Sequence, residues 1–189
     1  MKEIEYKFLL NTNEKLENFR NIISNVYKTK ERWEQLNWYY IAPWKNDLRI
    51  RKTETESYLI LKVWDMHDES KEEYEVKCDR EEFEKLDKML SKLGYSYDTK
   101  WFRYREEFEF NGFNITLDEN SGFWWMAEIE KVVEEWEEEQ AKKEILEFAQ
   151  SLGLDPTPKS DLDLIYNHYK KNWKEYYDER KVINLESLK

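Results

Sequence analysis

The sequence has little of what covalent cross-links, tight turns and membrane spans require. Its 189 residues include one cysteine, three prolines and four glycines. The single thiol, Cys78, excludes an intrachain disulfide, which fits a reducing compartment. No stretch approaches the roughly 18 consecutive apolar residues of a membrane helix, and the first residues lack the apolar core of a signal peptide. We therefore expect a cytoplasmic protein without a membrane segment.

Basic residues are also in deficit, because 31 lysines and arginines face 42 acids, a formal net charge of −11. This argues against a general nucleic-acid binder, since polyphosphate backbones are bound by net-basic surfaces. Aromatic residues, in contrast, are plentiful, with 9 Trp, 13 Tyr and 9 Phe, whereas disordered acidic chains are poor in them. The length fits one domain. We predict a folded domain over residues 1–170, followed by a polar C-terminal tail over residues 171–189.

Charged and apolar residues alternate with period two in several segments, which is typical of strands with two unlike faces. These segments lie near residues 3–8, 48–51, 58–64, 73–76, 102–110, 113–118 and 127–130, and residues 38–41 indicate a further short strand. One acid, Glu106, falls on the apolar side of its segment. Helical spacing predicts helices over residues 13–27, 79–93 and 135–152, and a last one from residue 160 or 161. The pattern predicts an α+β fold of about eight mostly antiparallel strands, with amphipathic helices on one side.

The polar faces of these expected strands consist of ionisable side chains of both signs. They are Glu3, Glu5, Lys7, Arg49, Arg51, Lys62, Glu73, Glu75, Arg103, Arg105, Asp118, Glu128 and Glu130. If the strands close into a barrel with helices packed on its apolar outer face, these side chains line the lumen. Unpaired charges in a dry interior cost too much free energy, so such a lumen must hold water or a ligand.

The residue types suggest which ligand this is. Arginine and lysine on separate strands suit phosphoryl oxygens, and the carboxylates would repel the same anion unless divalent cations lay between them. Acids, metal, phosphate and bases in one channel indicate phosphoryl chemistry. Any one of these alternations alone is better explained as a solvated strand face with cross-strand ion pairs. Their occurrence in nearly every expected strand favours a site.

The N-terminal segment Glu3-Ile4-Glu5-Tyr6-Lys7 resembles the Glu-x-Glu-x-Lys signature of the CYTH superfamily, also called triphosphate tunnel metalloenzymes. Six further segments resemble motifs of the family and follow in the family's order. They are Leu48-Arg49-Ile50-Arg51, Leu59-Ile60-Leu61-Lys62, Glu73-Tyr74-Glu75, Arg103-Tyr104-Arg105, Thr116-Leu117-Asp118 and Glu128-Ile129-Glu130. The first motif alone is weak, but all of them in order indicate a relationship over nearly the whole chain.

The resemblance implies an eight-stranded antiparallel β-barrel, the triphosphate tunnel, with amphipathic helices outside and a C-terminal helix. It implies that a triphosphate is bound by Lys7, Arg49, Arg51, Lys62, Arg103 and Arg105. It also implies that Mg²⁺ or Mn²⁺ is held by Glu3, Glu5, Asp118, Glu128 and Glu130. One of the late acids Asp118, Glu128 and Glu130 would be the catalytic base that takes a proton from the attacking water. Glu73 and Glu75 would support the site by binding metal or by orienting the bases.

These features predict a divalent-metal-dependent hydrolase of inorganic tripolyphosphate or of a small organic triphosphate. The enzymatic alternative is a class IV adenylate cyclase, which makes cyclic AMP and pyrophosphate from ATP. Arg32-Trp33-Glu34 stands near the place where such cyclases have a His-Phe element, which weakens this alternative. The segment 38–43 also lacks the Asp that the family commonly has there. The alternative from another class is a non-catalytic sensor of polyphosphate or nucleotide, or a scaffold of static ion pairs.

We expect a small triphosphate as partner, no long nucleic acid and no membrane, and the sequence is compatible with a homodimer. Trp124 and Trp125 precede the last acidic strand. Packing at a tunnel rim explains them best, with stacking on an organic substrate as the alternative.

Overall fold

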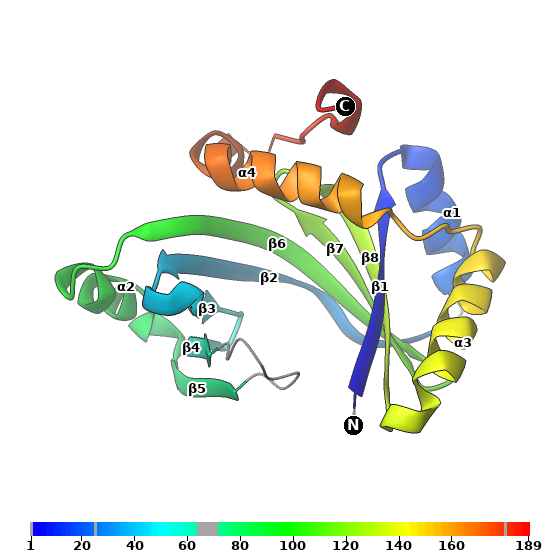
Figure 1. The fold of residues 1–189 in the computed structure, drawn as a ribbon, viewed down its shortest axis with the longest axis horizontal. Helices are drawn as coiled ribbons and strands as arrows, with labels where there is room; N and C mark the ends of the chain where they lie inside the picture. The colour runs from blue at the N-terminus through cyan, green and yellow to red at the C-terminus, as the bar shows by residue number, and fades with distance from the viewer. Residues whose placement is uncertain (1, 25, 64–71, 180) are drawn as a thin grey trace.

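One curved sheet of eight antiparallel strands forms the centre of the computed structural model, which describes residues 2–24, 26–63, 72–179 and 181–189. The strands are β1 (Lys2–Leu10), β2 (Tyr27–Ile41), β3 (Asp47–Lys52), β4 (Glu56–Val63), β5 (Glu72–Asp79), β6 (Tyr97–Phe110), β7 (Phe113–Asn120) and β8 (Trp124–Val133). Their order across the sheet is β1-β8-β7-β6-β2-β3-β4-β5. The α-helices are α1 (Asn13–Ile23), α2 (Phe83–Lys92), α3 (Glu138–Ser151) and α4 (Lys159–Glu179). Figure 1 shows the sheet bent into an arch, with β1 and β5 on opposite sides.

The predicted α+β class, the antiparallel sheet of eight strands and the C-terminal helix are confirmed. α2 and α3 also lie within the ranges predicted for them. Barrel closure is a separate matter. Within the described residues β1 and β5 are the two edges of the sheet, and no ladder joins them, so the closed barrel stays a prediction. The described helices include none that is long and apolar enough to cross a membrane.

The prediction is wrong for the stretch after the first helix. The sequence predicts a helix over residues 13–27 and a short strand at residues 38–41, but α1 ends at Ile23 and β2 spans 15 residues from Tyr27. Register shifts on both sides of Lys30 break the alternation in the first half of β2, which is why no period of two is visible there. β2 nevertheless lies in the middle of the sheet, between β6 and β3.

The C-terminal segment packs against the rest of the chain. α4 continues past residue 170 to Glu179, and beyond it Ile183 and Leu185 are buried. Val182 forms a parallel bridge with Gly122, in the turn between β7 and β8. Part of the 171–189 segment is thus packed on the rest of the chain, while a domain boundary at residue 170 stays a prediction.

Apolar side chains on the outer face of the sheet hold the helices and thereby fix the polar face opposite. α1 and α3 lie on the outer side of the arch (Figure 1), where Phe8, Phe19 and Ile145 are buried between them and the sheet. α2 covers β3 in the same way, around Ile50 and Phe83. Because the side chains of a strand alternate between two faces, burial of these residues turns the charged residues to the inner face of the arch.

α4 crosses one end of the sheet, at the top of the arch in Figure 1. Its Tyr169 is fully buried, stacks on Trp101 with ring centroids 3.9 Å apart, and donates a hydrogen bond to the carbonyl of Lys100 at 2.6 Å. Gly122 makes this approach sterically feasible, because a Cβ there would lie 2.3 Å from the Tyr169 ring. The ammonium of Lys100 also lies 5.9 Å from the ring centroid of Trp173 in α4. These contacts fix α4 across the end of the arch.

Glu106, the acid that breaks the alternation of β6, lies on the apolar face and is 4% exposed. Its carboxylate accepts hydrogen bonds of 2.8 Å from Arg20 of α1 and from Lys28 of β2. Burial alone would raise the pKa of Glu106, but the hydrogen bonds from these two cations hold it below its ordinary value. The three residues therefore join α1 to the sheet as long as the carboxylate is ionised.

We expect Glu106→Gln to lower the free energy of unfolding by about 2 kcal/mol at neutral pH, because it removes the buried negative charge that Arg20 and Lys28 share. Since the folded pKa is lowered, the stabilisation is present above the unfolded pKa of about 4.3 and is lost as the pH falls through the folded value. Urea titrations at about pH 7 and about pH 3 measure this change. Glu109→Gln, at an exposed position of the same strand, is the control and should cost less than about 0.5 kcal/mol. An equal loss for Glu106→Gln at both pH values would contradict the ion-pair interpretation.

Gly122→Ala should lower the free energy of unfolding by about 3 kcal/mol, since it combines a φ of 78° with the clash against Tyr169. Gly112→Ala is the matched control, because Gly112 has a φ of 77° and open space where its Cβ would stand. The excess loss for Gly122→Ala, measured by urea titration, isolates the steric term. Equal losses for the two variants would show that a Cβ at residue 122 does not clash with the Tyr169 ring.

Candidate functional site

Strand register brings the predicted charged residues onto one face, because directly opposed residues of an antiparallel ladder point to the same side. The opposed pairs are Glu5 with Glu130, Lys7 with Glu128, Arg105 with Asp118, Arg103 with Gln35, Arg51 with Asn37, Arg49 with Ile60, Ile60 with Glu75, and Lys62 with Asp47. The side chains of Glu3 and Glu73 lie outside the described residues. The other predicted site residues therefore share the inner face of the arch.

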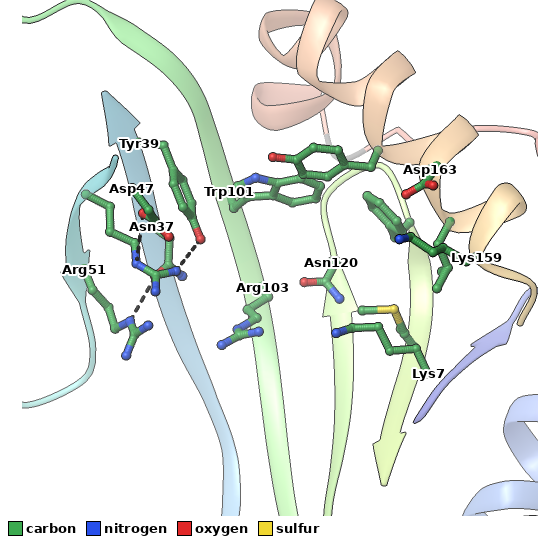
Figure 2. Close-up of a pocket in the computed structure, with 15 residues that line it drawn as sticks. Lys7, Asn37, Tyr39, Asp47, Arg51, Trp101, Arg103, Asn120, Lys159 and Asp163 are labelled. Carbon is green, nitrogen blue, oxygen red and sulfur yellow. Dashed lines mark hydrogen bonds and ion pairs between the residues drawn. The ribbon is translucent and has the colours of Figure 1, made fainter. Parts of the chain in front are cut away.

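A cavity of about 520 Å³ lies on this inner face, as Figure 2 shows. Four of the six predicted bases line it, from three different strands. They are Lys7 of β1, Arg49 and Arg51 of β3, and Arg103 of β6. Arg105 and Lys62 share the face but are outside the lining of the cavity. The sequence motifs thus converge in space, although they lie far apart along the chain.

Three uncharged residues of β2 hold the arginines in place. Gln35 accepts from Nε of Arg103 at 2.6 Å, Asn37 accepts from Nε of Arg51 at 3.0 Å, and the Tyr39 hydroxyl accepts from Nη1 of Arg49 at 2.6 Å. Bonds through Nε leave terminal guanidinium nitrogens for other partners. The sequence analysis missed this row because its members are uncharged. Their spacing of two, on a strand between two basic strands, is the signal that could have found them.

Asp118 has no exposed surface and is the counter-ion of two arginines. Its carboxylate accepts hydrogen bonds from Arg105 at 2.7 and 2.6 Å and from Arg103 at 3.1 Å. Burial alone would lower the pKa of Arg105, but the bond to Asp118 outweighs burial and raises it. For Arg103 burial dominates, and its pKa is lowered.

Arg51 differs from these two arginines. Burial lowers its pKa, and the positive charge of Arg49 lowers it further. Among the side chains that the structure describes, no carboxylate forms an ion pair with Arg51, and its hydrogen-bond partner is the neutral Asn37. The inner face thus includes a cation whose charge is under-neutralised, and a bound anion would stabilise it.

Three further acids, Glu5, Glu128 and Glu130, lie where β1 meets β8, whereas Glu75 lies on β5. Lys7 pairs with Glu5 at 2.7 Å and with Glu128 at 3.4 Å, and Asn114 donates a hydrogen bond to Glu130 at 3.0 Å. Burial alone would lower the pKa of Lys7, but the two carboxylates raise it. In the described part of the chain, no three acid, histidine or cysteine side chains converge as a metal site. Glu5 and Glu130 stand directly opposite each other, which is unfavourable because both are negatively charged. Carboxylate oxygens are hard donors of the kind that Mg²⁺ and Mn²⁺ bind.

Known proteins resemble this chain in sequence and in fold. The CYTH domain matches residues 1–160. Among solved structures, the PH1819 protein of Pyrococcus horikoshii OT3 has 26% sequence identity and a TM-score of 0.63, over 88% of this chain and 99% of that chain. A conserved hypothetical protein of Pyrococcus furiosus has 25% identity and a TM-score of 0.61, over 84% of this chain and 98% of that chain. A search of curated proteins gives no match.

A further solved structure is that of a candidate adenylyl cyclase from Hippeastrum, which is described as having a dominant triphosphatase activity. It has 18% identity and a TM-score of 0.62, over 88% of this chain and 96% of that chain. At this identity the likeness shows the fold alone. The roles of the individual site residues stay predictions.

We expect Asp118→Asn to lower the free energy of unfolding by about 3–5 kcal/mol, because it leaves two buried arginines without their shared counter-charge. A urea titration at neutral pH measures the loss. The control is Glu130→Gln on the same face, where the acid is partly exposed and the loss should stay below about 1 kcal/mol. Similar losses for both variants would contradict the assignment of Asp118 as the counter-ion.

Proposed function

This chain belongs to the CYTH domain family, and from that premise we propose that it is a divalent-metal-dependent hydrolase of inorganic tripolyphosphate or of a small organic triphosphate. The observation that supports this most directly is the convergence of four of the predicted cations on one cavity, one of which, Arg51, pairs with no carboxylate among the described side chains. A short phosphate chain can contact several of these cations at once. The negative charge of the phosphate chain would neutralise the positive charge that the acids of the inner face do not.

Binding of the phosphate chain would use the terminal guanidinium nitrogens, which donate to phosphoryl oxygens in forked pairs. Gln35 and Asn37 already hold Nε of Arg103 and Arg51, so these donors are oriented before the substrate arrives. Lys7 adds a point charge from β1, on the other side of the arch. A phosphate chain bound between the two sides would bridge them. We propose that the arch encloses this phosphate chain as a tunnel.

Glu5 and Glu130 would hold Mg²⁺ or Mn²⁺, with Glu128 beside them and Glu3 as a further candidate on β1. Bound there, the metal supplies positive charge that neutralises phosphoryl oxygens. Lys7 pairs with Glu5 and Glu128 and also lines the cavity, so its ammonium can exchange these carboxylates for a phosphoryl oxygen.

Glu128 or Glu130 would be the base that takes the proton from the attacking water. The Glu128 side chain is 16% exposed, and its contacts with Arg105 at 3.3 Å and with Lys7 and the Thr116 hydroxyl at 3.4 Å are all longer than the bonds that Asp118 accepts, so it retains accepting capacity. Asp118 is less suited, because it is fully buried and both of its oxygens accept from arginines. We therefore assign Asp118 to positioning of Arg103 and Arg105 rather than to metal binding or proton transfer. Glu75 acts on Arg51 electrostatically, which suits a supporting role.

The test is to incubate the protein with Mg²⁺ or Mn²⁺ and tripolyphosphate, ATP or thiamine triphosphate, and to measure orthophosphate, pyrophosphate and cyclic AMP. Metal-dependent release of orthophosphate supports the hydrolase. Cyclic AMP together with pyrophosphate would identify the cyclase instead, and metal-dependent binding without turnover would identify a sensor. If none of the three triphosphates binds, the proposed site is refuted.

Variants connect the activity to the inner face. Arg51→Ala should lower kcat/KM by about 100-fold, because it removes a preorganised donor to the phosphate chain. Arg32→Ala is the matched control, since Arg32 pairs with Glu119 away from the cavity, and kcat/KM should change by less than about twofold.

The double variant Glu5→Gln with Glu130→Gln should lose the metal-dependent activity. Full activity in that double variant would contradict the proposed metal ligands.

A further inference from the structure

The cavity of the inner face has two chemically different sides. Its cationic side consists of Lys7, Arg49, Arg51 and Arg103. The side toward α4 includes an apolar wall, formed by Trp101, Phe123, Met126, Leu162 and Tyr166, and Lys159 and Asp163 of α4 line the cavity beside it. Figure 2 shows Trp101 between the arginines and α4. A phosphate chain gains nothing from apolar surface, because desolvating its charges against such a wall costs free energy. The wall therefore indicates a second part of the ligand.

The aromatic rings of the wall are held in place by α4. The buried Tyr169 stacks on Trp101 and fixes the plane of its ring. Tyr166, one turn earlier in the helix, is nearly parallel to Trp101, with an interplanar angle of 9° and ring centroids 6.1 Å apart. Tyr166 is 42% exposed although it lines the cavity. Flat, parallel and partly exposed rings are surfaces on which another ring can stack.

The wall includes residues that lie beyond the family domain. The domain match ends at residue 160, whereas Leu162 and Tyr166 belong to α4. The cations of the cavity, in contrast, all lie within the matched residues. The cationic side of the cavity thus lies within the matched residues, and part of the apolar wall lies beyond them.

We propose that the apolar wall is the subsite for a planar aromatic heterocycle joined to the triphosphate, so that the preferred substrate is an organic triphosphate rather than inorganic tripolyphosphate. This inference rests on the proposed function, because the cationic side binds the phosphates. Stacking of a ring on one aromatic side chain strengthens binding by about 5-fold to 150-fold. Inorganic tripolyphosphate has no ring and therefore lacks this additional binding.

Asn120 provides a polar contact at the border of the two sides. Its side chain lies between Arg103 and the wall in Figure 2. The amide nitrogen is buried and has no hydrogen-bond partner in the described part of the chain. It can donate to an acceptor atom of the heterocycle or of the group that links it to the phosphates. A buried donor at this point suits a ligand that extends from the arginines to the wall.

Tyr166→Ala tests the subsite, because it removes a partly exposed ring of the wall. Steady-state kinetics at fixed Mg²⁺ give KM for ATP, thiamine triphosphate and tripolyphosphate, and calorimetric titration in EDTA gives Kd without metal-dependent turnover. For the wild type we expect a lower KM for at least one organic triphosphate than for tripolyphosphate. Tyr166→Ala should raise the ratio of organic to inorganic KM by at least about fivefold, whereas Tyr166→Phe, which keeps the ring, should leave it within about twofold.

Leu164→Ala is the control, since Leu164 is a 40% exposed side chain of the same helix that does not line the cavity. Its KM ratio should equal that of the wild type. An unchanged ratio in Tyr166→Ala, or a wild type that prefers tripolyphosphate to both organic compounds, overturns the subsite even if tripolyphosphate is hydrolysed. If no triphosphate is hydrolysed, the proposed function fails, and the corresponding ratio of Kd values decides the subsite.

Discussion

The crowding of positive charge on the inner face is the constraint to which the rest of the site is adapted. Arg103 and Arg105 stand two residues apart on one strand and point to the same side, where each repels the other. The buried Asp118 on the neighbouring strand accepts hydrogen bonds from both, which makes their proximity stable. Gln35 and Asn37 act differently, because a neutral amide orients a guanidinium without cancelling its charge. The face can therefore fold while part of its positive charge remains for an anion.

This arrangement depends on packing at a distance from the cavity. A slip of one residue in the register would move every charged side chain of a strand to the opposite face. Burial of residues such as Phe8 and Ile129 under α1 and α3 prevents that slip. The Glu106 ion triad fixes α1 on the outer face of the sheet. The close contact of Tyr169 with Gly122 fixes α4 across one end of the same sheet. The geometry of the site is thus determined largely by residues that would touch no ligand.

The sequence is informative about the inner face because charge alternates with period two there, and that period survives in nearly every strand. β2 does not show this charge pattern, because register shifts around Lys30 break the alternation and because Gln35, Asn37 and Tyr39 on its inner face are uncharged. The placement of α4 is equally invisible, because it depends on the contact between Tyr169 and Gly122, which are far apart in the sequence. That placement makes Trp101 the tryptophan that lines the cavity, whereas the tryptophans at 124–125 lie outside its lining. Local patterns reveal which face a side chain occupies, whereas its partners are set by tertiary contacts.

The acids show how a chain with a net charge of −11 can have a cationic cavity. Two of them, Asp118 and Glu106, are buried and each accepts hydrogen bonds from two cations, so their charge is already neutralised. Glu5 and Glu130 instead oppose each other across the ladder of β1 and β8, and Lys7 can neutralise only one charge. Burial thus separates acids that position basic residues from acids that are suited to a divalent cation. A long polyanion would meet the acidic surface, whereas a short phosphate chain inside the arch would meet mainly arginine and lysine.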